Sequence, residues 1–214
     1  MRPSYRICRI IYPMKLLKTI TEAEVIAHFL KTEITSRRWG DGIREILAKD
    51  GKSEEIITRP DTANHTENDY RLNLFDEFRG YKRRAKLFDG FPLDVSWHKA
   101  LITKEELGKV LYINWDYWLE ITDGTRLPKD AVTKLRNGGL DPQNEQYFRG
   151  VAEALQNGTT FPEFIFVGVD ERSPLVVLEG HARLTGYFLV PELIPEEMEV
   201  IVGLSPYMAE WGVY

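Results

Sequence analysis

The chain has 214 residues, of which 43% are hydrophobic and 29% are charged, as in ordinary globular proteins. The formal net charge of −5 and a pI of about 5.5 argue against a general nucleic-acid binder, whose domains tend to be basic. Cys8 is the only cysteine, so internal disulfides and cysteine-based metal sites are excluded, which fits a reducing cytoplasm.

Histidine spacing and hydropathy exclude further classes of protein. The four histidines are widely scattered, and no apolar run approaches the ~20 residues that span a membrane. Residues 1–13 are basic and mildly apolar but lack the features of a signal peptide, so the folded chain begins at Met1 or near Met14. We therefore expect a cytoplasmic protein without zinc, haem or a membrane partner.

The N-terminal part of the sequence predicts a mainly helical extension over residues 1–91. Thr21-Glu-Ala-Glu24 is a capping box, which predicts that a helix starts at Thr21. Gly40 and Gly42 interrupt the helical pattern, and a short second helix should then end near Gly51. The next stretch, 54–68, is polar and is expected to be a loop.

Aromatic residues recur at helical spacing over 69–88, which predicts a further helix. Its last part, Tyr81–Lys86, is a basic cluster. Such a cluster is typical of a solvated helix end, and the alternative is contact with nucleic acid or an acidic partner.

The C-terminal part mixes strand and helix signals. Residues 93–102 alternate in hydropathy and predict a strand, and Thr103-Lys-Glu-Glu106 is a second capping box. Residues 109–120 are rich in β-branched and aromatic side chains, which also predicts a strand. Pro128 is expected to open a helix that ends at Asn137.

The stretch from Pro174 to Arg183 carries the main functional signal. The apolar run 175–178 ends at Glu179-Gly180, and a helical pattern follows at once, so we expect a strand, a tight glycine turn and a helix. The start of such a helix favours anions. The alternative is a solvated strand–helix turn with a surface salt bridge.

The sequence E-G-H-A-R-L-T-G at residues 179–186 resembles the signature turn of the ParB/sulfiredoxin superfamily. The flanks agree with that family: an amphipathic helix over 145–157 and a strand over 162–167 precede the turn, and a strand over 198–202 follows it. The resemblance covers roughly 110–203. His181 stands where the redox branch has its cysteine, so sulfiredoxin-type chemistry is not expected. Ala182 replaces a second basic residue of the partition proteins.

This resemblance implies an α+β (mixed α/β) fold, with a ParB/sulfiredoxin-like domain over 92–214 on which the helical extension packs as one unit. It also implies binding of a small phosphorylated ligand or a nucleotide, with Mg²⁺, in a phosphotransferase or nucleoside triphosphate hydrolase. Glu179 would be the general base or a magnesium ligand, and His181 would donate to developing negative charge. The phosphate contacts would come from Gly180, His181, Ala182 and Arg183.

Three residues near the end of the expected strand over 109–120 are second-rank site candidates, namely Asp116, Glu120 and Arg126. Two alternatives to the enzyme stay open. One is a non-catalytic ligand or protein-interaction module on the same fold, and the other is a DNA-associated ParB-like protein. The acidic net charge and the short remainder after Gly203 count against nucleic acid as the main partner. The aromatic tail from Tyr207 to Tyr214 is expected to pack back on the domain, or else to form a lid or partner surface.

Overall fold

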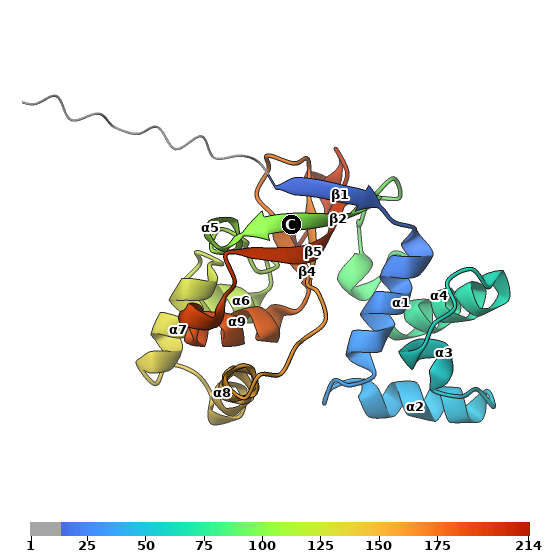
Figure 1. Cartoon of the computed structure of the whole chain (residues 1–214), viewed down its shortest axis with the longest axis horizontal. Coiled ribbons are helices and arrows are strands. Elements are labelled where there is room, and N and C mark those ends of the chain that lie inside the picture. The colour runs from blue at the N-terminus through green and yellow to red at the C-terminus, as the bar shows by residue number, and fades with distance from the viewer. Residues whose placement is uncertain (1–13) are drawn as a thin grey trace, which may run out of the picture.

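The computed structural model describes residues 14–214, so the expectations about Cys8 and the start of the folded chain lie outside the described residues. Within this range nine helices surround a five-stranded mixed sheet, which confirms the predicted α+β class (Figure 1). No helix among these residues has the length and apolar character needed to cross a membrane.

The sheet has the strand order β1-β2-β5-β3-β4, in which β3 and β5 are parallel and all other neighbours are antiparallel. The strands are β1 (Lys15–Thr19), β2 (Ser96–Thr103), β3 (Ile165–Gly168), β4 (Val176–Glu179) and β5 (Glu197–Leu204). The helices are α1 (Glu22–Glu33), α2 (Gly40–Lys49), α3 (Glu55–Thr58), α4 (His65–Arg79), α5 (Lys104–Leu107), α6 (Asp116–Ile121), α7 (Pro128–Arg136), α8 (Pro142–Gln156) and α9 (His181–Leu189). Three short 3-10 helices are η1 (Lys86–Phe88), η2 (Pro191–Leu193) and η3 (Met208–Glu210).

Both predicted capping boxes are present, at Thr21 before α1 and at Thr103 before α5. The prediction that Gly40 interrupts the helical pattern is wrong, because Gly40 is the first residue of α2. A Cβ on Gly40 would lie 2.5 Å from the carbonyl oxygen of Ile34, so glycine allows the close approach of α2 to the end of α1.

The loop expected over 54–68 is also wrong, because it contains α3 and the start of α4. The side chain of Asn64 accepts a hydrogen bond from the Glu67 backbone N–H at 3.2 Å, and this cap starts α4. The helix stops at Arg79 because Gly80 has the left-handed φ of 75°. The basic cluster Tyr81–Lys86 therefore follows α4 and is not part of it. The N-terminal half also supplies β1, which the sequence did not predict.

The strand predicted over 109–120 is replaced by an extended segment and α6. Leu111 forms a single parallel bridge with Val176, through backbone bonds of 2.8 and 2.9 Å, and the pairing goes no further. The backbone N–H of Asn114 instead donates to the Val213 carbonyl at 2.8 Å, which directs the chain away from the sheet. Tertiary packing thus overrides the β propensity of these residues.

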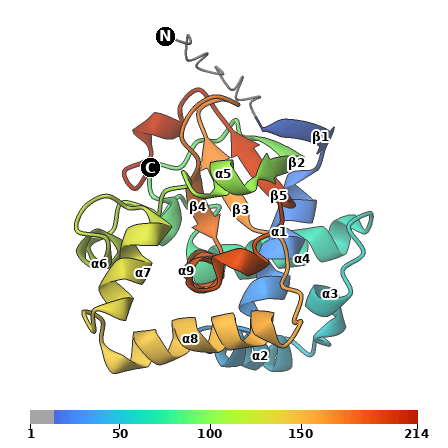
Figure 2. The same ribbon diagram turned by 60° about the vertical axis from the view of Figure 1, so that its left-hand side comes forward.

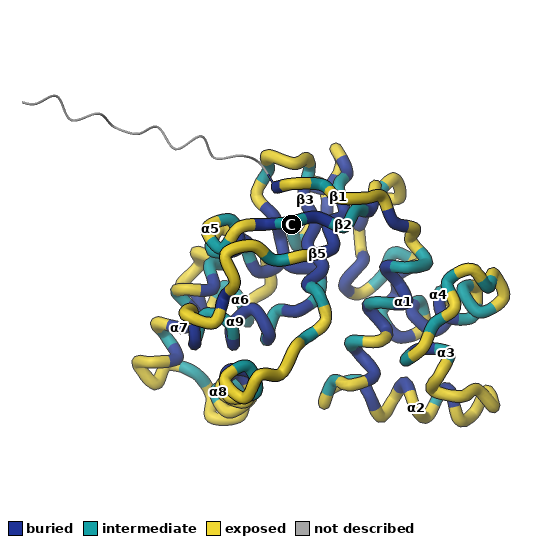
Figure 3. Tube along the Cα trace, in the orientation of Figure 1, coloured by how far each residue is buried: buried dark blue, intermediate teal, exposed yellow. Residues whose placement is uncertain are grey.

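Each face of the sheet is covered by its own group of helices (Figure 1). Residues of α1, α4 and the C-terminal tail pack with one face, and residues of α5, α7 and α9 pack with the other. Figure 2 shows α8 running along the lower edge, below α9. Figure 3 shows that buried residues follow the inner strands and the inward sides of the helices, whereas the edge strand β1 is mostly exposed. The helical N-terminal part and the sheet therefore share one hydrophobic core.

The C-terminal tail packs back on this core. Trp211 is 2% exposed, and its indole N–H donates to the Leu87 carbonyl at 2.9 Å. The hydroxyl of Tyr214 donates to the Pro174 carbonyl at 2.6 Å. Tyr207, in contrast, remains 55% exposed.

The contact between α8 and α9 gives a stability test. A Cβ on Gly186 would lie 2.3 Å from a methyl group of Val151, whereas a Cβ on the exposed Gly150 of α8 meets nothing within 4 Å. We expect Gly186→Ala to lower the free energy of unfolding by ~1–3 kcal/mol through overpacking. Gly150→Ala should raise it by up to ~1 kcal/mol. Chemical denaturation measures both, and equal effects of the two substitutions would contradict the packing of α9 on α8.

Candidate functional site

The predicted strand, glycine turn and helix are present at residues 176–189. β4 ends at Glu179, Gly180 has a left-handed φ of 105°, and α9 starts at His181. A Cβ on Gly180 would lie 2.5 Å from the ring of Phe164, so both the backbone conformation and the space require glycine. No side chain caps the start of α9, so its first N–H groups receive no acceptor from a capping side chain.

Arg183 and Glu179 form an ion pair one helical turn apart. The guanidinium donates to the Glu179 carboxylate and to the Pro162 carbonyl, and it lies 5.2 Å from the centre of the Phe164 ring. The two side chains are only 8% and 12% exposed. In this structure Arg183 therefore holds the turn together and fixes Glu179 beside the start of α9.

His181 is neutral and stacked on aromatic rings. Its ring lies 5.0 Å from that of Trp118 and 6.1 Å from that of Tyr112, both nearly parallel to it. Part of the residue is accessible, yet Nε2 is buried and has no hydrogen-bond partner among residues 14–214. Burial, with the charges of Arg79 and Arg183, lowers the pKa of His181 to about 3. The imidazole is therefore uncharged at neutral pH.

The second-rank candidates do not join the turn. Asp116 and Glu120 lie on α6, not on a strand, and both are exposed. The guanidinium of Arg126 donates to the carbonyls of Tyr112 at 2.7 Å and Tyr214 at 3.0 Å, so it connects the C-terminus to the core. Helix α6 contributes Trp118 to the turn instead.

Two charged residues that the sequence did not indicate lie close to this turn, the buried Glu33 and the partly buried Arg79. Glu33 is the last residue of α1 and is 7% exposed, and its Oε1 lies 3.7 Å from Nε of Arg79, the last residue of α4. The hydroxyl of Ser36 donates to Oε2 of Glu33 at 3.2 Å. Burial and, to a smaller extent, the charge of Glu179 raise the pKa of Glu33 to about 7, against the attraction of Arg79.

Three more side chains surround these groups. Arg37 and Arg38, which follow α1, are exposed, and the Arg37 guanidinium lies 5.6 Å from the centre of the Tyr147 ring on α8. Tyr147 is 40% exposed, and its pKa is raised by burial and by the charge of Glu179. The charge of Arg38 acts on both Glu33 and Arg79. These contacts join α1, α4 and α8 to the β4–α9 turn.

We call this set of side chains the seam, because it lies where the N-terminal helices meet the β4–α9 turn. Its members are Glu33, Arg37, Arg38, Arg79, Tyr147, Glu179, His181 and Arg183. With His181 neutral and both carboxylates ionised, the arginines give the seam an excess of two positive charges, in a chain whose net charge is −5. The seam is therefore electrostatically suited to an anion.

A neighbouring network fixes the position of α1. Nε2 of His28 lies 2.9 Å from the Glu163 carbonyl, and the Glu163 carboxylate forms an ion pair with Lys99 of β2. Lys99 also lies 3.2 Å from the carboxylate of Glu199 on β5. The network holds α1 against the segment that precedes β3, and so keeps Glu33 near the turn.

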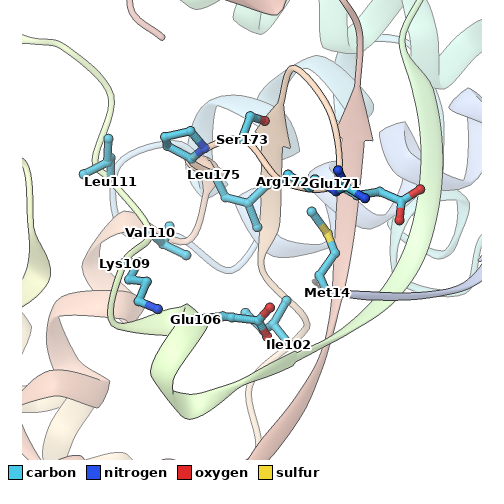
Figure 4. Close-up of a pocket in the computed structure, with 11 residues that line it drawn as sticks. Met14, Ile102, Glu106, Lys109, Val110, Leu111, Glu171, Arg172, Ser173 and Leu175 are labelled. Carbon is cyan, nitrogen blue, oxygen red and sulfur yellow. The ribbon is translucent and has the colours of Figure 1, made fainter. Parts of the chain in front are cut away.

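The pocket expected at the turn does not coincide with either of two cavities in the described part of the chain. The larger, of about 500 Å³, has walls that include Met14, Ile102, Val110 and Leu175 (Figure 4). Its charged lining residues are two cations and two carboxylates: Lys109, Arg172, Glu106 and Glu171. A second cavity of about 340 Å³ lies along α7 and the turn between α6 and α7. The balanced charge of the larger cavity favours no anion, in contrast to the seam.

No family model, curated protein or solved structure matches this chain. The resemblance to the ParB/sulfiredoxin superfamily therefore stays a prediction from the sequence. Among residues 14–214, no group of three or more His, Cys, Asp or Glu side chains is arranged to hold a metal ion.

The raised pKa of Glu33 predicts a pH dependence of stability. Because the folded protein holds this proton up to about pH 7 and the unfolded chain only to about 4.5, protonation favours folding. The contribution of Glu33 is complete below pH 4.5 and is lost as the pH rises to 7, by at most ~3 kcal/mol. Denaturation at several pH values measures it. Glu33→Gln should remove this part of the slope, and an unchanged slope would contradict the burial of Glu33.

Proposed function

We propose that the protein binds a phosphate-bearing small molecule, a nucleotide or a phosphorylated metabolite, in the seam. The observation that carries this proposal is the excess positive charge beside the uncapped start of α9. Fixed cations and backbone N–H groups are the donors that phosphate oxygens accept from.

The seam divides these donors into two sets. The guanidinium groups of Arg79 and Arg183 are largely removed from water and paired with carboxylates, so they would supply a constant positive field behind the helix start. Arg37 and Arg38 are exposed at the rim, where their guanidinium groups lie 5.6 Å and 4.6 Å from the ring centres of Tyr147 and Trp39. A ligand at the rim would draw them away from these rings. Mg²⁺ would arrive with the phosphates of a nucleotide, since this ion is usually held by substrate phosphates and one or two carboxylates.

Binding is tested by removing the rim cations. We expect the full chain to bind pyrophosphate, ADP or ATP in calorimetry, with and without Mg²⁺. Arg37→Ala and Arg38→Ala should each weaken binding by roughly 1–3 kcal/mol, the value of one charge-assisted hydrogen bond. Arg59→Ala removes an exposed cation outside the seam and should leave the affinity unchanged. If none of the three anions binds, or if the control weakens binding equally, the proposed function is wrong.

Phosphotransfer or hydrolysis is a second candidate function. It is favoured by the position of Glu179, whose carboxylate Arg183 fixes beside the start of α9. A carboxylate there is placed to accept a proton from a hydroxyl or water that attacks the phosphate.

We expect Glu179→Gln to keep nucleotide binding and to abolish phosphate release from ATP in the presence of Mg²⁺. Glutamine still accepts a hydrogen bond from Arg183, but it does not take up a proton. A coupled phosphate-release assay gives the readout. If the wild-type chain binds ATP and releases no phosphate, the enzyme candidate is discarded and binding remains.

A further inference from the structure

Of the two carboxylates in the seam, Glu33 is the one whose ionised form is less stabilised by neighbouring groups. Its side chain is almost fully buried, and the nearest cation, Arg79, lies 3.7 Å away without a hydrogen bond from Nε. Glu179 differs, because the guanidinium of Arg183 donates directly to it. The Glu33 carboxylate accepts a hydrogen bond from the neutral Ser36 hydroxyl at 3.2 Å. A buried carboxylate that receives no hydrogen bond from a cation is the member of the cluster that most readily takes up a proton.

The groups facing Glu33 come from every element around it. Arg79 comes from α4, Ser36 and Arg38 from the connection after α1, and Glu179 from β4. Tyr147 comes from α8, and the charge of Glu33 helps to raise its pKa, so its hydroxyl stays neutral near pH 7. Arg79 and Arg38 keep their charge at all physiological pH values, and the Ser36 hydroxyl has none. A proton on Glu33 therefore leaves the charge of Arg79 unbalanced and adds one positive charge to the seam.

We propose that Glu33 regulates the anion affinity of the seam through its own protonation, binding being tight when it is protonated and weak when it is ionised. This inference rests on the proposed function. When Glu33 is ionised, its carboxylate neutralises Arg79 and repels an incoming phosphate. When Glu33 is neutral, the positive charge of Arg79 attracts the ligand and no negative charge on Glu33 repels it.

The change falls near neutral pH. Burial places the pKa of Glu33 at about 7, whereas that of His181 is about 3, so His181 stays neutral throughout this range. By thermodynamic reciprocity a bound anion favours the protonated form of Glu33 as much as that form favours the anion. Binding near pH 7 should therefore take up part of a proton from the buffer.

Sulfate is the probe, because it is a dianion at every pH used and only the protein titrates. Calorimetry of the full chain at constant ionic strength should show the sulfate affinity falling about fivefold between pH 6 and pH 8, as expected when the protonated form binds about tenfold more tightly. Glu33→Gln, which imitates the protonated form, should hold the wild-type pH 6 affinity across the whole range. Glu45→Gln removes the same charge from an exposed position on α2 and should keep the wild-type slope.

A second measurement needs no variant. Sulfate binding to the wild-type chain at pH 7, in two buffers of different ionisation enthalpy, should show net proton uptake, and at pH 9 it should show much less. Equal slopes in the wild type and Glu33→Gln, or no uptake at pH 7, would overturn the role of Glu33 and leave anion binding intact. Absence of sulfate binding at every pH would overturn the proposed function and this inference together.

Discussion

The contact between Gly180 and Phe164 is the constraint on which the seam depends. The ring of Phe164 occupies the space that a side chain at position 180 would need, and the left-handed φ of Gly180 reverses the chain directly from β4 into α9. One turn later Arg183 lies over the same ring and donates back to Glu179. A side chain at position 180 would displace these groups together.

The charge of the seam is unevenly distributed between its inner and outer parts. Removing charged groups from water is costly, and the inner part balances its charges, since Arg79 and Arg183 face Glu33 and Glu179. The excess of two positive charges lies on the exposed Arg37 and Arg38 at the rim. An incoming anion would meet this net positive charge first. The larger cavity, with its equal numbers of cations and carboxylates, carries no comparable imbalance.

Local signals explain which parts of this molecule the sequence predicts. The capping boxes at Thr21 and Thr103 and the turn at Gly180 are each determined by a few adjacent residues, and all three are present. The prediction of a strand over 109–120 is wrong, because a long-range backbone hydrogen bond from Asn114 to Val213 directs the chain away from the sheet. Glu33 and Arg79 give no sequence signal, since they lie at the ends of two separate helices and meet the turn only through tertiary packing.

The central claim is that the seam holds an anion, and the position of a bound anion tests it most directly. Tungstate is a phosphate-like dianion whose metal atom gives a strong anomalous signal in crystals of the full chain. The account predicts a tungstate peak between the start of α9 and the guanidinium groups of Arg37, Arg38 and Arg79. Tungstate bound only elsewhere, for example at Lys109 and Arg172 beside the larger cavity, would contradict it.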